Sequence, residues 1–201
     1  MRNIVTAKPT RLRILQTAES LFARHGYGAT TLDHIASAVE IKRPSLIYHF
    51  SDKASLYQSV LEQLFARQRN FFNVSSKTDL LPLNRLKGLM DSWLDYALQE
   101  PNYLRIFLHH LAAGYNPKKS FWIRARPIVR LWESTLSEGQ RQGVFKEVDL
   151  IHFLSMVGGM TAYFILMHSE DEKNIAHSRQ YKRFRTHLFD NIKSLVLMPD
   201  Q

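Results

Sequence analysis

The chain of 201 residues contains no cysteine. Neither a disulfide framework nor a metal site with thiolate ligands can therefore form. The nine histidines do not occur at carboxylate-rich ligand spacings, and His109 and His110 are direct neighbours. On a helix their side chains would point about 100° apart, so the two could not hold one metal ion together. We expect no metal site and no cofactor.

Long apolar runs are also missing. The longest apolar-rich stretch, from Phe153 to Met167, is interrupted by two glycines and by polar side chains. It is shorter than the ~20 residues that a membrane-spanning helix needs. The first residues have no apolar core of a signal peptide. We expect a buried helix in this stretch, a cytoplasmic location and no membrane partner.

Enzyme motifs are absent from the sequence as well. The chain has only eight glycines and no glycine-rich loop that would bind a phosphate. Gly158 and Gly159 fall inside the apolar stretch, where they permit close packing of helices. No local set of nucleophile, base and orienting group is recognisable. We therefore expect no catalytic residues and a protein that is not an enzyme.

Positive charge, in contrast, is in excess, with a formal net charge of +9. Residues 1–70 contain ten Lys and Arg against five Asp and Glu, so this third of the chain carries more than half of the excess. Charge of this sign favours a polyanionic partner such as nucleic acid. Many basic proteins bind no nucleic acid, so charge alone leaves the question open.

A pair of short helical patterns lies between Thr30 and Phe50. Apolar residues at i, i+3, i+4 and i+7 predict the first helix, and we expect Thr30 to be its N-cap. The second helix begins near Lys42 or Arg43, with Pro44 in its first turn. Two short helices joined by a tight turn, the second with basic and aromatic side chains, indicate a helix-turn-helix.

The same stretch carries a family resemblance. The run from Thr31 to Phe50 and onward into SDKASLY resembles the N-terminal domain of TetR-family transcriptional regulators, over about residues 10–65. The residues that match the family pattern are Ile35, Ala36, Leu46, Tyr48, His49, Phe50, Lys53 and Leu56. Glu40 departs from the usual glycine, Lys42 from the usual serine and Ile47 from the usual tyrosine. Glu40 predicts either an unfavourable left-handed residue in the turn or a slightly different turn.

This resemblance implies a set of DNA contacts. Arg43 is suited to donate two hydrogen bonds to a guanine edge, and Ile47 to touch a thymine methyl. Hydroxyl, imidazole and ammonium groups are suited to phosphates. The predicted DNA-binding residues are Thr30, Thr31, Lys42, Arg43, Pro44, Ser45, Ile47, Tyr48, His49 and Lys53. Two alternatives stay open, namely that Lys42 and Arg43 are merely solvated charges and that His49 is a structural cap.

Helical periodicity continues to the end of the chain, and no strands are evident. We expect a first helix capped by Thr10 and ended by Gly26, and a connecting helix over residues 53–72 capped by Ser51. The predicted fold is all-α, with about nine helices. Residues 1–52 form a helix-turn-helix domain with an N-terminal arm, and residues 53–201 form a helical ligand-sensing and dimerisation domain with a loop near residues 73–82.

The larger domain has two predicted roles. TetR-like regulators pair through their last two long helices, which implies a homodimer interface of Val157, Phe164, Ile165, Tyr181, Phe184, Leu188, Ile192 and Leu195. Aromatic, methionine and histidine side chains are candidates to line an effector cavity, unless they simply fill the core. These candidates are Trp93, Tyr96, His109, His110, Trp122, Trp132, Phe153, Met156, Met160 and Tyr163.

Together the patterns predict a TetR-like DNA-binding transcriptional regulator. In its simplest form it is a homodimeric repressor, released from a palindromic double-stranded DNA operator by a small-molecule effector. One alternative is a helical enzyme or ligand-binding protein with an incidental helix-turn-helix. Another is an activator or a dimer without an effector. The side chains around Arg43 and Tyr48 favour DNA binding.

Overall fold

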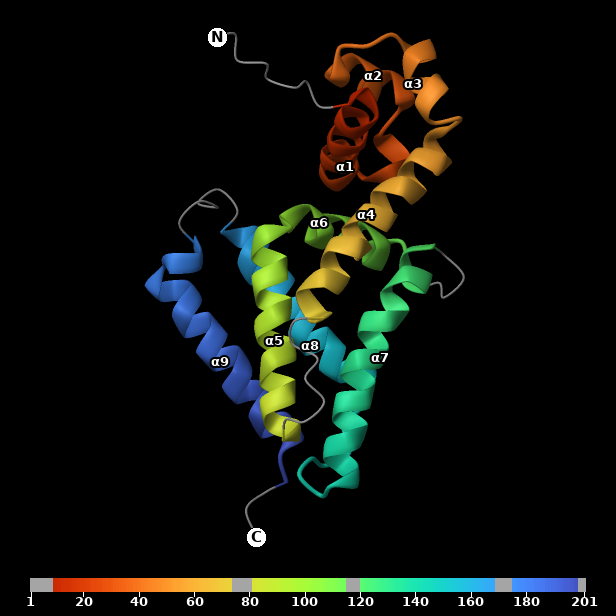
Figure 1. Ribbon diagram of the computed structural model, residues 1–201. Helices are drawn as coiled ribbons and strands as arrows, with labels where there is room; N and C mark the ends of the chain where they lie inside the picture. Colours follow the sequence, from red (N-terminus) through yellow and green to blue (C-terminus); the bar gives the residue numbers. More distant parts are fainter. Residues whose placement is uncertain (1–8, 74–80, 115–119, 169–174, 199–201) are drawn as a thin grey trace, which may run out of the picture. The chain divides into compact units, whose positions relative to one another are not determined.

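The computed structural model describes residues 9–73, 81–114, 120–168 and 175–198. Within these ranges it contains nine α-helices, one short 3-10 helix and no β-sheet, so the all-α prediction is confirmed (Figure 1). The predicted N-terminal arm and the loop near residues 73–82 lie largely outside the described residues. The helices are α1 (Thr10–Ala29), α2 (Leu32–Val39), α3 (Arg43–His49), α4 (Lys53–Asn73), α5 (Pro82–Gln99), α6 (Pro101–Ala112), α7 (Ser120–Arg141), α8 (Leu150–Met167), η2 (Ile175–His177) and α9 (Arg179–Val196).

The packing of the helices divides the chain into two compact units. Unit 1 comprises the residues up to Phe65 together with Arg105–Arg124, and unit 2 comprises Ala66–Leu104 and the residues from Ala125 onward. The chain passes from one unit to the other within α4, α6 and α7. The predicted domain boundary at residue 53 stays a prediction.

Helix α1 supplies the core of unit 1. Its apolar residues Ile14, Ala18 and Phe22 are buried. The helix begins after Pro9 without a side-chain cap, so the prediction that Thr10 caps it is wrong. Gly26 has φ 76° and ψ 167° and interrupts the helix, because a residue without a Cβ adopts this conformation at little cost. The predicted break at this glycine is confirmed.

Helices α2 and α3 form the helix-turn-helix of unit 1. The hydroxyl of Thr31, not that of Thr30, caps α2 by accepting a hydrogen bond from His34 N at 3.2 Å. Glu40 takes the left-handed conformation (φ 59°, ψ 45°), the first of the two predicted alternatives. Its N–H donates to Ser37 O and that of Ile41 to Ala36 O, both at 3.0 Å. These bonds satisfy the last carbonyls of α2.

The N-terminus of α4 is capped by Asp52, which corrects the prediction of Ser51. Ser55 N donates to Asp52 Oδ1 at 2.7 Å, and Asp52 N donates to Ser55 Oγ at 3.3 Å. The two residues therefore satisfy each other's backbone donors in a capping box. The hydrogen bond from the Ser55 backbone is the main reason that the pKa of Asp52 lies below its ordinary value.

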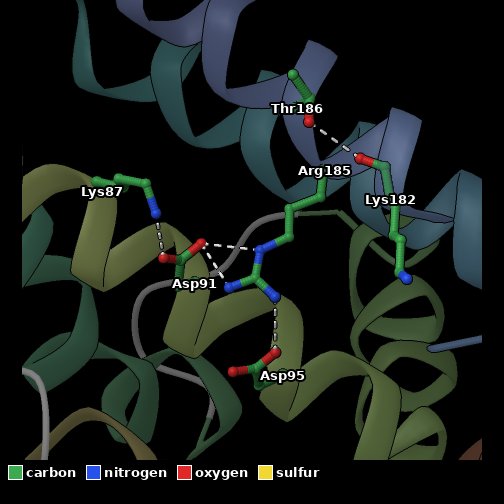
Figure 2. A network of polar contacts seen from close by, with 6 residues as sticks. All are labelled: Lys87, Asp91, Asp95, Lys182, Arg185 and Thr186. Atoms are coloured by element: carbon green, nitrogen blue, oxygen red, sulfur yellow. Dashed lines mark hydrogen bonds and ion pairs between the residues drawn. The ribbon is translucent and has the colours of Figure 1, made fainter. Parts of the chain in front are cut away.

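Unit 2 is built around contacts among α5, α8 and α9. Arg185 of α9 donates to two carboxylates on α5, at 2.8 Å to Asp91 and 3.4 Å to Asp95 (Figure 2). Between α8 and α9 the rings of Phe164 and Phe184 stack with centroids 4.1 Å apart. Polar and aromatic contacts thus fasten α9 to both neighbours.

The left-handed turn residue leads to a first prediction. Glu40→Gly should raise the free energy of unfolding by about 0.5–1 kcal/mol, because the strain of a left-handed side-chain residue exceeds the entropy that glycine loses on folding. Urea denaturation measures the change. Glu40→Ala is the control, since it removes the carboxylate but keeps the Cβ and its strain. Equal stability of the two variants would contradict the explanation.

Candidate nucleic-acid interface

Helix α3 buries very few of its side chains against the rest of unit 1. Within Arg43–His49, only Leu46 is buried, and Phe50 just after the helix is buried as well. The remaining side chains of α3 are exposed or half-buried, and Tyr48 is 86% exposed. Because the helix has seven residues, its stability depends on these two anchors and on the turn before it. The outer face is left open for a partner.

The guanidinium of Arg43 lies at the start of this open face. Its Nη1 donates to Asp33 Oδ2 of α2 at 2.9 Å, and both side chains are largely exposed. An exposed pair of this kind contributes only ~0–1 kcal/mol, so DNA can compete for the guanidinium at little cost. Asp33 therefore orients Arg43 without holding it strongly. The sequence gave no sign of this pairing.

The two threonines before α2 have different environments. Thr31 is exposed, and its oxygen accepts from His34 N, which leaves its O–H able to donate to a phosphate. Thr30 is buried, and its hydroxyl donates to Gly26 O at 2.8 Å. The prediction of Thr30 as a DNA contact is therefore wrong for its side chain. Its hydroxyl instead joins the end of α1 to the start of α2.

Lys53 connects α4 with the same junction. Its ammonium lies 2.9 Å from Tyr27 O, 3.0 Å from Thr30 O and 3.5 Å from Gly28 O, and 4.4 Å from the centre of the Tyr27 ring. An ammonium has three N–H donors, so these carbonyls match its full capacity. A contact with phosphate would have to replace one of them. The predicted phosphate contact stays a prediction, and the structure adds a tethering role.

Two arginines of α1, which the sequence did not single out, support the helix-turn-helix from behind. Arg13 Nη2 donates to Val39 O at the end of α2, at 2.6 Å. The guanidinium of Arg11 lies 4.9 Å from the centre of the Phe50 ring. Part of the positive charge of this region therefore serves the fold. Lys42, Arg43, Tyr48 and His49 remain on the accessible side.

Residues 14–60, which contain these helices, match the model of the family described as bacterial regulatory proteins, tetR family. The N-terminal domain is a TetR-family domain. Its predicted resemblance over about residues 10–65 is thereby confirmed. The departures at Glu40 and Ile47 do not prevent the match.

Curated relatives of the TetR-family domain are regulators of gene expression. The chain is 30% identical over 96 residues to the biofilm operon icaADBC HTH-type negative transcriptional regulator IcaR of Staphylococcus aureus (strain Newman), covering 48% of this chain and 50% of that protein. The chain thus spans about half the length of IcaR. It is 25% identical over 163 residues to the HTH-type transcriptional repressor NicS of Pseudomonas putida, covering 79% and 76% of the two chains.

Solved structures extend the similarity of fold to nearly the whole chain. The hemolysin II transcriptional regulator HlyIIR has a TM-score of 0.73 at 19% identity, over 94% of this chain and 98% of that one. The ketosteroid transcriptional regulator KstR2 of Mycobacterium tuberculosis has a TM-score of 0.66 at 19% identity, over 98% and 100%. At such low identity these similarities establish the fold alone.

The ten predicted effector residues are divided between the two units. His109, His110 and Trp122 belong to unit 1, and the other seven belong to unit 2. Within unit 2, Trp132 and Phe153 are buried against each other with ring centroids 5.5 Å apart. Trp93 and Tyr96 are buried as well, and each packs against Tyr103. For these four side chains the structure favours the alternative that they fill the core.

The prediction that Met160 and Tyr163 line an effector cavity is wrong, because both side chains are exposed on α8. Together with Met156 and Met167 they follow the spacing i, i+4, i+7 and i+11, which places them on one face. We call these four residues the α8 stripe. Met156 is half-buried, whereas Tyr163 is 71% and Met167 65% exposed. The stripe is an outward surface and not the wall of a cavity.

The predicted dimer residues are corrected in part. Five of the eight pack into the chain's own core and so cannot face a partner: Val157, Ile165, Tyr181, Leu188 and Ile192. Phe164, Phe184 and Leu195 are half-buried. The error arises because a period of three to four residues marks an apolar face without revealing which neighbour covers it.

Helix α8 contradicts the expectation that no apolar stretch reaches the length of a membrane span. Its 18 residues, with a mean hydropathy of 1.7, are long and apolar enough to cross a membrane, and 33% of them are buried. The core helix of a helical bundle meets the same criteria of length and composition. In unit 2, one face of α8 contacts α5 and α9. Its composition therefore reflects this packed face together with the exposed α8 stripe.

In the described parts of the chain, no three His, Asp or Glu side chains come close enough to form a metal site. His109 and His110 make separate contacts, with Ala23 O and with the Tyr57 hydroxyl respectively. The absence of a metal site remains an expectation from the sequence.

The tether formed by Lys53 leads to a second prediction. Lys53→Met keeps the aliphatic stem but removes the charged donor, and should lower the free energy of unfolding by about 1.5 kcal/mol. Lys42→Met is the matched control, because Lys42 is exposed and should change stability by less than ~0.5 kcal/mol. Urea denaturation of both variants measures the difference. If both variants are as stable as the parent chain, Lys53 is not a tether.

Proposed function

We propose that this chain is a DNA-binding transcriptional regulator that represses its target genes. The observation that carries the proposal is a TetR-family domain in which Arg43 and Tyr48 of the short helix α3, and Lys42 just before it, are exposed. The relatives IcaR and NicS are described as a negative regulator and a repressor, which favours repression over activation. Regulators of this class act on DNA inside the cell and are not enzymes, which agrees with the predicted cytoplasmic location.

Some exposed groups of the helix-turn-helix are suited to contact DNA bases, and others are suited to contact phosphates. Arg43 has a planar fork of donors that suits the guanine edge in the major groove, and Asp33 holds it in position before DNA arrives. Tyr48 and Thr31 carry hydroxyls at the rim of the same surface and are suited to phosphates. Lys42 adds a positive charge just before α3. Specificity in this scheme depends mainly on Arg43 and Ile47.

The α8 stripe supports a second part of the proposal, namely that two copies of the chain form a homodimer. The stripe is apolar, and the neighbouring Gly159 is exposed with open space beyond it, so another helix can approach closely. A self-complementary patch closes into a two-fold dimer. The half-buried Phe184 and Leu195 of α9 extend this interface. The dimer would bind an operator with two-fold symmetric half-sites.

A small-molecule effector is the third part of the proposal. Unit 2 is larger than a dimer interface requires, and nearly all of the chain shares the fold of HlyIIR and KstR2. An effector that binds the free regulator better than the DNA-bound one would release it from the operator. This step is independent of DNA recognition and can fail while the rest of the proposal stands.

Selection of bound sequences from random DNA tests the function directly. We expect enrichment of a two-fold symmetric sequence. With that sequence, Arg43→Ala should weaken binding by about 1–3 kcal/mol and relax the preference at one position per half-site. Lys42→Ala should weaken binding to all DNA sequences alike. It should also lower, by about 1, the steepness with which the logarithm of the binding constant falls with the logarithm of the salt concentration. If no sequence is enriched at moderate salt, the chain is not a sequence-specific regulator.

The homodimer has its own prediction. Tyr163→Glu places a charge in the α8 stripe and should weaken dimerisation at least ~10-fold, because an unpaired charge cannot be buried in an apolar interface. Ile151→Glu is the matched control, since Ile151 is 75% exposed on the same helix but lies off the stripe. Analytical ultracentrifugation measures both. An equal loss in both variants, or no loss in either, would contradict the proposed interface.

A further inference from the structure

Unit 1 contains a cavity of about 620 Å³ at the end of α1. Its walls come from α1 and the residues that follow its break, from the first turns of α4, and from the last turns of α6. A volume of this size is typical of sites for small organic molecules. The residues that line it are Phe22, His25, Gly26, Tyr27, Gly28, Ala29, Ala54, Tyr57, Gln58, Ile106, His109, His110, Ala113 and Ser120.

The cavity has an aromatic wall. The rings of Phe22, Tyr27 and Tyr57 contact one another, with centroids 4.8 Å apart for Phe22 and Tyr57 and 4.9 Å apart for Tyr27 and Tyr57. Tyr27 is 40% exposed, whereas Phe22 and Tyr57 are buried. Planar rings favour stacked or edge-on aromatic neighbours. The wall therefore suits a flat aromatic molecule.

His109 supplies a hydrogen-bonding group with a defined tautomer. Its Nε2 lies 3.2 Å from Ala23 O, and because a carbonyl only accepts, this nitrogen carries the hydrogen. Nδ1 is then an acceptor in the neutral ring and becomes a donor when the ring is protonated. A Cβ on Gly26 would lie only 3.2 Å from Nδ1, so a residue with a side chain at this position would crowd the imidazole.

Four other polar side chains of the cavity are paired with one another. The Tyr57 hydroxyl and His110 Nε2 are 2.7 Å apart, and Gln58 Nε2 donates to Ser120 Oγ at 2.8 Å. Burial raises the pKa of Tyr57, so that its hydroxyl stays neutral. None of the described lining residues is Asp, Glu, Lys or Arg. Three imidazoles, which can become positive, are the only titratable groups of basic character among these residues.

We propose that this cavity binds a planar aromatic molecule that carries a carboxylate, and that the bound molecule weakens DNA binding. The rings receive the aromatic part, and a protonated His109 donates to the carboxylate in a charge-assisted hydrogen bond. A cationic ligand finds no carboxylate among the lining residues. The site is distinct from the core of unit 2, where the sequence placed most of its effector residues.

The coupling to DNA follows from the segment that forms one wall. Tyr27 and Gly28 offer the carbonyls that Lys53 holds, and the same segment leads through Thr30 into α2. A ligand that displaces the Tyr27 ring also disturbs the ammonium beneath it, which lies 4.4 Å from the ring centre. The tether between α4 and the helix-turn-helix is then loosened. This inference rests on the proposed function, because it assumes that unit 1 binds DNA.

Three probes with one ring system test the chemistry: 1-naphthoate, 1-naphthalenemethanol and 1-naphthylmethylammonium. Isothermal titration of the full chain should give the tightest binding for naphthoate, at least ~10-fold tighter than for the ammonium. His109→Phe should reduce naphthoate affinity about 10-fold and leave the alcohol nearly unchanged. Equal affinity for the three probes in the parent chain, or no binding of any, would overturn the proposal.

A matched pair of variants tests the location. Ala113→Trp places an indole into the cavity from its exposed rim and should abolish naphthoate binding, whereas Ala112→Trp, at the adjacent exposed residue that does not line the cavity, should not. Both should fold and bind the selected DNA sequence. If the two variants bind naphthoate equally, the site lies elsewhere and the proposal fails.

Measuring the selected DNA sequence with and without naphthoate tests the coupling. We expect an about 10-fold loss of DNA affinity at saturation, and by reciprocity naphthoate should bind the DNA complex weaker by the same factor. Unchanged DNA affinity would overturn the proposal while leaving DNA binding itself intact. A failure of the proposed function would instead appear as the absence of any selected sequence, before a ligand is added.

Discussion

The contact between the Lys53 ammonium and the carbonyls of Tyr27, Gly28 and Thr30 is the interaction on which unit 1 depends. Gly26 breaks α1, and the carbonyls that Lys53 contacts follow the break. Lys53, in the first turn of α4, meets these groups with charge-assisted donors. One side chain of α4 therefore contacts the backbone at the end of α1 and just before α2.

This arrangement explains how a helix of only seven residues, α3, can remain exposed. Helix α3 buries Leu46 and little else, so its position is set by the turn at Glu40 and by Phe50 at its end. Arg11 and Arg13 of α1 hold these two points from behind. Stability is thus supplied by the neighbours of α3, and its own side chains are released for a partner. The cost is visible at Glu40, whose left-handed backbone is strained.

Helix positions could be predicted from the sequence, because stripes such as that of Leu32, Ile35 and Val39 are dictated by the helical period. The predicted N-caps of α2 and α4 were each one residue away from the observed ones. At α2 the reason is that Thr30 and Thr31 have the same chemistry, and only the surrounding fold decides which of them is buried. The effector and dimer residues were harder. An aromatic such as Phe153 has the same sequence pattern whether it lines a cavity or fills a core, and Leu188 the same whether its neighbour is its own chain or another.

In helix α8 the structure distinguishes apolar side chains that their own chain covers from those that it leaves exposed. Val157 and Ile165 are covered within unit 2, while Met160 and Tyr163 are not, so an apolar sequence serves two opposite faces. The second face is also held in place within unit 2, because Arg185 pairs α9 with Asp91 on α5 (Figure 2). The stacked rings of Phe164 and Phe184 join α9 to α8. A surface whose backbone is already fixed loses less entropy on association. The clamp inside unit 2 would therefore favour the proposed dimer without touching the partner, just as the Lys53 tether would favour the proposed DNA binding from behind α3.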